Sequence, residues 1–184
     1  MKRIIAMALA VLMIVVASVA GTIAWLSDTT GPVENVFTTS NIDITLEETE
    51  REYKMVPGYD IPKDPIVTVE KDSEACWLFI KVEESADFAN YMTYGLADGW
   101  EFSGVPGIYC REVNANAADQ GFHVLNGDKV TVNTTVNKAM MDAIDNGTVN
   151  APTLSFTAYA TQLYKNATEK FTVAEAMVNL GLTP

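Results

Sequence analysis

The side chains that could perform catalysis are few, and His123 is the single histidine of the chain. Zinc sites of the HExxH type, and all sites with several histidines, need more than one, so both are excluded. A Ser/His/Asp triad would have to use His123, but no GxSxG turn or comparable nucleophile motif occurs. Phe122 and Val124 flank His123 in a predicted strand, which favours a solvent-facing histidine. We therefore expect no enzyme, no catalytic residue, no metal and no cofactor.

Carboxylates are abundant, but their spacing indicates no catalytic couple. The pairs Glu47/Glu48 and Glu83/Glu84 are more typical of solvated strand ends. No EF-hand loop, P-loop or GxGxxG motif occurs, so calcium binding would require scattered loop acids. With 24 acidic and 12 basic residues, the net charge is −12. Such a surface repels phosphate backbones, which argues against a nucleic-acid partner.

Cys76 and Cys110 are the two cysteines of the chain, and no CxxC motif occurs. A disulfide-dense scaffold and a cysteine-rich zinc site are therefore excluded. A disulfide between the two is geometrically reasonable if their strands face each other across a sandwich. Two buried thiols are the alternative, because free cysteine is among the most buried side chains.

Residues 1–24 have the three-part form of a secretory signal peptide. Lys2 and Arg3 are followed by an apolar run over residues 4–20, and Thr22 and Ala24 supply the small residues that signal peptidases require. The preferred cleavage lies between Ala24 and Trp25, with the bond after Ala20 as the second choice. An uncleaved membrane anchor is the alternative, because residues 4–26 are uncharged and long enough to span a bilayer.

Residues 25–40 mix large apolar side chains with polar residues and the pair Gly31-Pro32. This pair prevents a continuous helix and favours an extended or turned course. The segment is therefore either a disordered tail or a strand that needs a partner sheet. Its large apolar residues are Trp25, Leu26, Val33, Val36 and Phe37.

From residue 41 onward the pattern is that of β-strands. Alternation with period two, as at Ile42, Ile44 and Leu46, predicts half-buried strands. The segment 76–82 is apolar on both faces, which predicts a central strand covered on its second side. The strands are predicted over 41–47, 66–70, 76–82, 100–102, 107–113, 122–125, 130–136 and 153–163. Short strands separated by turn signals indicate an all-β antiparallel sandwich or jelly roll over 41–184.

Short peripheral helices complete the predicted domain. Pieces around 87–94 and 140–145 are expected to be helical. At the C-terminus, Thr172 and Glu175 form the sequence signature of a capping box, and Gly181 is a stop signal. We therefore predict a C-terminal helix between Thr172 and Gly181.

The junction between leader and domain contains GTIAWLSDTT, followed by NVFTTSNIDITLEE. This junction resembles that of the TasA/camelysin family, which comprises secreted matrix proteins of Gram-positive bacteria. Ser40 departs from the family pattern, which usually has glycine there. Further on, CWLFIKVEE and LSFTAYATQ resemble two of the family's core strands. The residues of the junction that fit the pattern are Gly21, Thr22, Ala24, Trp25, Leu26, Ser27, Asp28, Asn35, Phe37, Ile42, Asp43 and Ile44.

This resemblance implies a jelly-roll subunit that assembles head to tail into fibres of an extracellular biofilm matrix or cell surface. It also implies cleavage by a dedicated signal peptidase of the SipW type, and accessory matrix proteins are further candidate partners. The freed N-terminal segment of one copy would add as a strand to the next copy. Trp25, Leu26, Val33, Val36 and Phe37 would then be its anchoring side chains.

The sequence is also compatible with two other functions. A monomeric secreted or cell-surface module that binds a glycan or a protein would use the same sandwich and would not need its N-terminal tail. A metalloprotease, which the name camelysin suggests, ranks last because no zinc motif is present.

Overall fold

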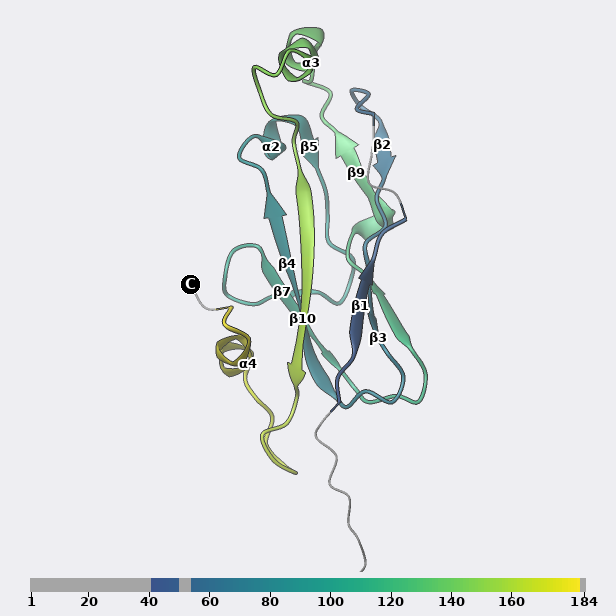
Figure 1. Ribbon diagram of the computed structural model, residues 1–184, viewed down its shortest axis with the longest axis vertical. Coiled ribbons are helices and arrows are strands. Elements are labelled where there is room, and N and C mark those ends of the chain that lie inside the picture. Colours follow the sequence, from purple (N-terminus) through teal and green to yellow (C-terminus); the bar gives the residue numbers. More distant parts are fainter. Residues whose placement is uncertain (1–40, 50–53, 183–184) are drawn as a thin grey trace, which may run out of the picture. The chain divides into compact units, whose positions relative to one another are not determined.

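The computed structural model describes residues 41–49 and 54–182. The described chain is mostly β, with antiparallel sheets and few short helices (Figure 1). The predicted signal peptide and the segment 25–40 lie outside the described residues. The described strands form sheets in the orders β1–β3–β8, β10–β4–β7–β6 and β2–β9–β5. Their bounds are β1 Ile44–Glu47, β2 Asp60–Pro62, β3 Ile66–Val69, β4 Cys76–Glu84, β5 Met92–Thr93, β6 Glu101–Phe102, β7 Ile108–Val113, β8 Gln120–His123, β9 Lys129–Val132 and β10 Leu154–Gln162.

Strand β4 is the central strand that the sequence predicts. It pairs with β10 over its whole length, from Glu84 opposite Leu154 to Cys76 opposite Gln162, and with β7 on its other side. Both of its faces are buried because its apolar residues point both ways. Leu78 belongs to one core cluster and Phe79 to another.

The first core cluster contains side chains from two sheets. Val67 and Val69 of β3 are buried together with Leu78 and Ile80 of β4. The alternating residues of β1 and β10, together with Ile42 just before β1, pack against this cluster, as their period-two patterns predict. These residues are Ile42, Ile44, Leu46, Leu154, Phe156, Ala158 and Ala160.

The second core cluster lies under the C-terminal helix α4 (Val173–Leu180). Ala176 and Met177 of α4 are buried in the same cluster as Trp77 and Phe79 of β4. The helix begins with the predicted capping box at Thr172 and is followed by Gly181 at φ 67° and ψ 26°, so both termini are confirmed. The helix therefore covers the second face of β4.

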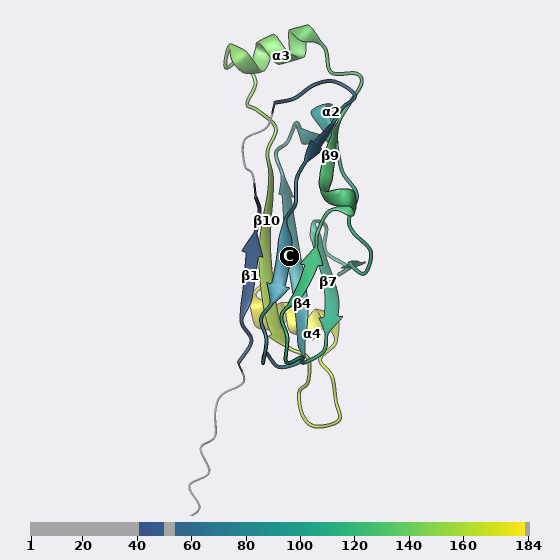
Figure 2. The same ribbon diagram turned by 90° about the vertical axis from the view of Figure 1, so that its right-hand side faces the viewer.

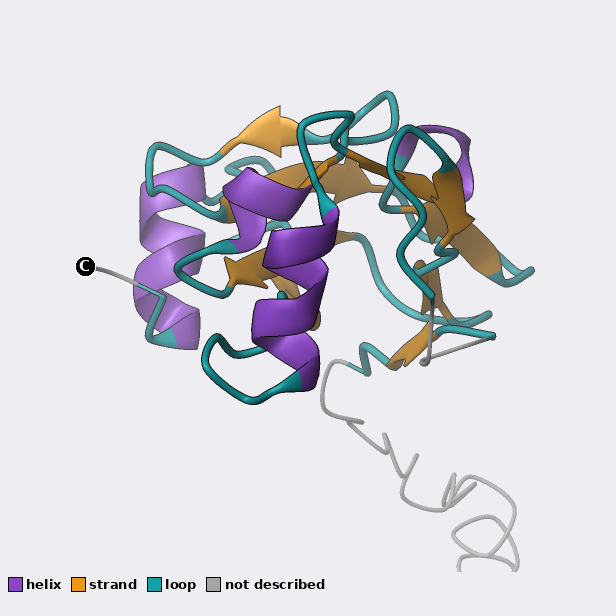
Figure 3. Ribbon diagram, turned by 90° about the horizontal axis from the view of Figure 1, so that it is seen from above, coloured by secondary structure: helices purple, strands orange, loops and turns teal. Residues whose placement is uncertain are grey.

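The third core cluster belongs to the sheet β2–β9–β5 and to two further helices, α2 (Phe88–Tyr91) and α3 (Lys138–Asp145). Both helices were expected, although α2 is shorter than the predicted span. Strands β2 and β5 were not predicted, because they are three and two residues long. The helices of the described chain are purple and its strands orange in Figure 3. None of the described helices is long and apolar enough to cross a membrane.

Candidate functional site

The outermost strand of the four-stranded sheet, β10, has an unusual edge. It is nine residues long, LSFTAYATQ, and contains no charged residue, proline or glycine. It pairs with β4 on one side and is last in the strand order. Proteins usually protect such edges with charges, proline, bulges or short strands, because an open edge is a template for another chain. None of these protections occurs within β10.

The hydrogen-bond phase of β10 decides which of its backbone groups point outward. Just before β10, the Ser85 N–H donates to the Thr153 carbonyl at 3.0 Å, and just after it, the Leu163 N–H donates to the Ala75 carbonyl at 2.9 Å. Both pairs extend the β10–β4 register. In an antiparallel ladder hydrogen-bonded pairs recur at every second residue, so Ser155, Thr157, Tyr159 and Thr161 bond toward β4. The groups that point away from β4 belong to Leu154, Phe156, Ala158, Ala160 and Gln162.

These outward N–H and C=O groups form no backbone hydrogen bond with any described residue. Strand β1 lies beside β10 (Figures 1 and 2). The two strands are not paired, however, since β1 belongs to the sheet with β3 and β8. Two edge strands therefore meet along a seam without closing it by hydrogen bonds.

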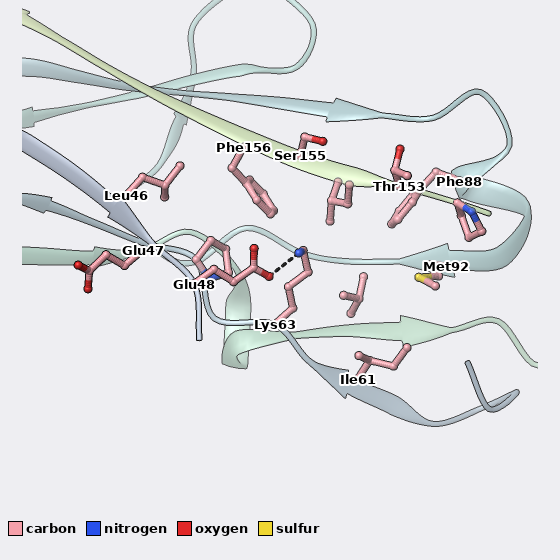
Figure 4. Close-up of a pocket in the computed structure, with 14 residues that line it drawn as sticks. Leu46, Glu47, Glu48, Ile61, Lys63, Phe88, Met92, Thr153, Ser155 and Phe156 are labelled. Atoms are coloured by element: carbon pink, nitrogen blue, oxygen red, sulfur yellow. Dashed lines mark hydrogen bonds and ion pairs between the residues drawn. The ribbon is translucent and has the colours of Figure 1, made fainter. Parts of the chain in front are cut away.

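At the start of β10 this seam borders a groove with a volume of about 530 Å³ (Figure 4). One wall is the first part of β10, and the end of β1 lies beside it. Nine of the fourteen lining side chains are apolar, and Glu47, Glu48, Lys63, Thr153 and Ser155 add polar and charged groups. The lining residues are Leu46, Glu47, Glu48, Ile61, Lys63, Pro65, Phe88, Met92, Val130, Pro152, Thr153, Leu154, Ser155 and Phe156.

A charged pair lies within this groove. The Lys63 ammonium group bonds the Glu48 carboxylate, and the two side chains are only 11% and 17% exposed. Lys63 Nζ also lies 5.5 Å from the centroid of the Phe156 ring on β10 (Figure 4). Removing one partner of a buried pair leaves an uncompensated charge, which is strongly destabilising. The pair therefore ties the chain after β1 to the segment between β2 and β3.

The cysteine prediction is wrong in its disulfide form. Cys76 and Cys110 are both buried free thiols. Their strands, β4 and β7, are neighbours in one sheet instead of facing each other across two. Cys76 belongs to the first core cluster and Cys110 to the second, so the two side chains leave opposite faces of the sheet. Burial raises the pKa of each thiol to about 11.

Of the remaining residues that the sequence analysis singled out, the structure describes His123 but not the cleavage and anchoring residues. The His123 side chain is 53% exposed, with Nδ1 at 2.8 Å from Asp128 Oδ1, so the expected surface histidine is confirmed. No group of three or more His, Cys, Asp or Glu residues suited to a metal ion occurs in the described part of the chain. The cleavage residues Ala24 and Trp25 lie outside the described residues. So do the other anchoring residues Leu26, Val33, Val36 and Phe37.

Comparison with known proteins adds no family or fold assignment. The chain matches no protein-family model, and no curated protein or solved structure matches it.

Proposed function

We propose that this protein is a secreted structural subunit that polymerises head to tail into extracellular matrix fibres. In this proposal residues 25–40 of one copy add as a strand to the outer edge of β10 in the next copy. The observation that supports it most directly is this edge of β10. Its nine residues are uncharged, and its outward N–H and C=O groups form no backbone hydrogen bond with any described residue. In strand addition, the backbone of the added segment forms hydrogen bonds with these outward groups.

The proposed occupant fits the groove in composition. Residues 25–40 contain large apolar side chains, among them Trp25, Val36 and Phe37, and no lysine or arginine. The groove beside β10 offers apolar lining side chains, including Leu154 and Phe156, against which some of them could pack. A strand that adds along β10 also places every second side chain on the face of the first core cluster.

A head-to-tail contact explains filaments without any further interface. The donor segment and the acceptor edge are different surfaces of the same chain, so each copy can donate once and accept once. Such heterologous contacts form open filaments when the rotation does not close. Within this proposal the sheets form a jelly roll, which is supported by the first core cluster containing side chains from both β3 and β4. The dedicated signal peptidase frees the donor segment, and accessory matrix proteins are further proposed partners.

The test uses proline at one outward position of β10. Ala158→Pro removes an N–H that points away from β4, so the β4 ladder should survive and the added strand should lose a bond. We expect a folded protein by circular dichroism and thermal melting, and few or no fibres by negative-stain electron microscopy. Ala158→Ser retains the N–H and should form fibres like the wild type.

Two further variants make the outcome decisive. Thr157→Pro removes a ladder bond to β4 and should lower the melting temperature strongly, which verifies the hydrogen-bond phase. A chain that begins at Ile42 lacks the donor segment and should remain unassembled. Wild-type fibre yield from folded Ala158→Pro, or fibres from the shortened chain, would overturn the proposal.

The second candidate function is a monomeric glycan- or protein-binding module, favoured by one hollow of about 470 Å³. Its lining includes the aromatic residues Phe88, Tyr94 and Tyr109. The Tyr94 hydroxyl donates to Glu84 Oε1 at 2.7 Å, and burial raises the pKa of Tyr94. This function predicts a monomer that is unaffected by Ala158→Pro.

A further inference from the structure

Arg111 of β7 has a guanidinium group that is packed on two sides. Its Cζ atom lies 4.0 Å from the centroid of the Phe122 ring on β8 and 5.4 Å from the centroid of the Trp100 ring. A Cβ atom at Gly99 would lie 2.9 Å from Arg111 Nη2 and 3.3 Å from Cζ, so the backbone of Gly99 also lies against the group. The guanidinium is therefore held in one position by its neighbours.

No described residue forms a hydrogen bond with the Arg111 guanidinium. Its Nε atom is buried without a hydrogen-bond partner. No described carboxylate lies within ion-pairing distance of the group, and burial alone lowers its pKa. The Trp100 indole N–H is already used, since it donates to the His123 carbonyl at 2.8 Å. Nε is therefore a buried donor without a partner. Arginine remains charged in proteins, and no described carboxylate compensates this charge.

We propose that the outer edge of the Arg111 guanidinium, formed by Nη1 and Nη2, binds an oxyanion, either a carboxylate or a phosphate group. The planar fork of arginine matches both groups with paired hydrogen bonds. Packing against Phe122 and Gly99 fixes the fork before binding, which reduces the entropy lost when a ligand is bound.

Two sources offer this chemistry. One is a small anion in solution. The other is a carboxylate on a second copy of the chain, which carries 24 acidic residues. The second source would add a contact between subunits, but the site does not depend on the proposed strand addition.

The direct test is a titration of the purified protein with inorganic phosphate, and separately with acetate, at constant ionic strength. Nuclear magnetic resonance would follow the side-chain N–H signals of Arg111 and Trp100. We expect saturable shifts with at least one of the two anions. Arg111→Met keeps much of the packing volume and should weaken binding by about tenfold or more, since a charge-assisted bond is lost. Lys170→Gln, which alters a lysine already paired with Glu112, should bind like the wild type.

Sedimentation at several protein concentrations distinguishes the two sources. If the carboxylate comes from a second copy, wild-type protein should associate, and both phosphate and Arg111→Met should reduce the association. If a small anion is the ligand, the mass should stay constant while the titration still saturates. If Arg111→Met fails to fold, Arg111→Lys replaces it and should bind more weakly because the planar fork is lost. Absence of saturable shifts with both anions, together with no effect of Arg111 on association, would overturn the proposal.

Discussion

Lys165 Nζ lies 2.6 Å from Glu175 Oε1, and this contact joins the loop after β10 to the first turn of helix α4. Glu175 also closes the capping box, since its Oε2 atom accepts from the Thr172 N–H at 2.9 Å. One carboxylate therefore links a helix terminus to a loop. The contact with Lys165 and the bonds from Thr172 lower the pKa of Glu175 to about 2.

The first prediction concerns the pH dependence of stability. The pKa of Glu175 is lower in the folded protein than its ordinary value of 4.5. The carboxylate therefore contributes stability above that value, and the contribution is lost as the pH falls toward 2. Unfolding by urea at a series of pH values measures this. As the pH falls, the free energy of unfolding should decrease less for Glu175→Gln than for the wild type. Glu169→Gln removes another partner of Lys165 but leaves the capping box intact. Its free energy of unfolding should therefore decrease with falling pH more than that of Glu175→Gln. Identical pH profiles for wild type and Glu175→Gln would contradict this assignment.

The second prediction concerns the core beneath α4. Phe79 is fully buried, whereas Phe102 is 60% exposed. Phe79→Ala should reduce the free energy of unfolding by about 3–5 kcal/mol, because it removes buried area and leaves a cavity. Phe102→Ala makes the same chemical change at the surface and should cost no more than about 0.5 kcal/mol. Chemical denaturation of both variants measures the difference, and equal losses would show that Phe79 is not in a packed core.

The third prediction concerns the contact between Gly99 and Arg111. Gly99 has a φ of 89° and Gly104 a φ of 97°, so alanine is strained at both. At Gly104 an added Cβ would meet nothing within 4 Å, whereas at Gly99 it would crowd the guanidinium. Gly104→Ala should cost about 1–2 kcal/mol from backbone strain. Gly99→Ala should cost more than this, as measured by thermal unfolding. A smaller loss for Gly99→Ala than for Gly104→Ala would contradict the close packing.

The fourth prediction concerns the thiols. Burial and a raised pKa keep Cys76 and Cys110 protonated and inaccessible, so neither should react with iodoacetamide in the native protein. Both should react after unfolding in the absence of reductant, because no disulfide joins them. Mass spectrometry of the alkylated protein counts the modified thiols. If the unfolded chain can be alkylated only after a reductant is added, the free-thiol assignment is wrong.

The fifth prediction concerns the export signal. N-terminal sequencing of the exported protein should begin at Trp25, because Thr22 and Ala24 occupy the positions that signal peptidases read. Ala24→Phe places a bulky residue at the cleavage position and should leave the leader attached. Retention of residues 1–24 on the wild-type exported protein would favour the membrane anchor instead.

Local patterns in the sequence determine much of this fold. The cap at Thr172 and the stop at Gly181 depend on backbone geometry within one or two turns, so helix α4 can be predicted from its own residues. The strands predicted over 41–47, 107–113 and 153–163 were likewise recognisable, because alternating burial leaves its period in the sequence. The sequence by itself also predicts the export signal and the absence of known catalytic motifs.

Only the tertiary structure decides how these elements meet. Which strand is a neighbour of β4 is a long-range property, and it places Cys76 and Cys110 on opposite faces of one sheet. The groove depends on Lys63 and Phe156, which no local pattern connects, and the open edge depends on the hydrogen-bond phase between β10 and β4. The alternating strand pattern of LSFTAYATQ can be recognised from the sequence alone. Which half of its backbone groups faces outward is set by pairing with residues far away in the chain.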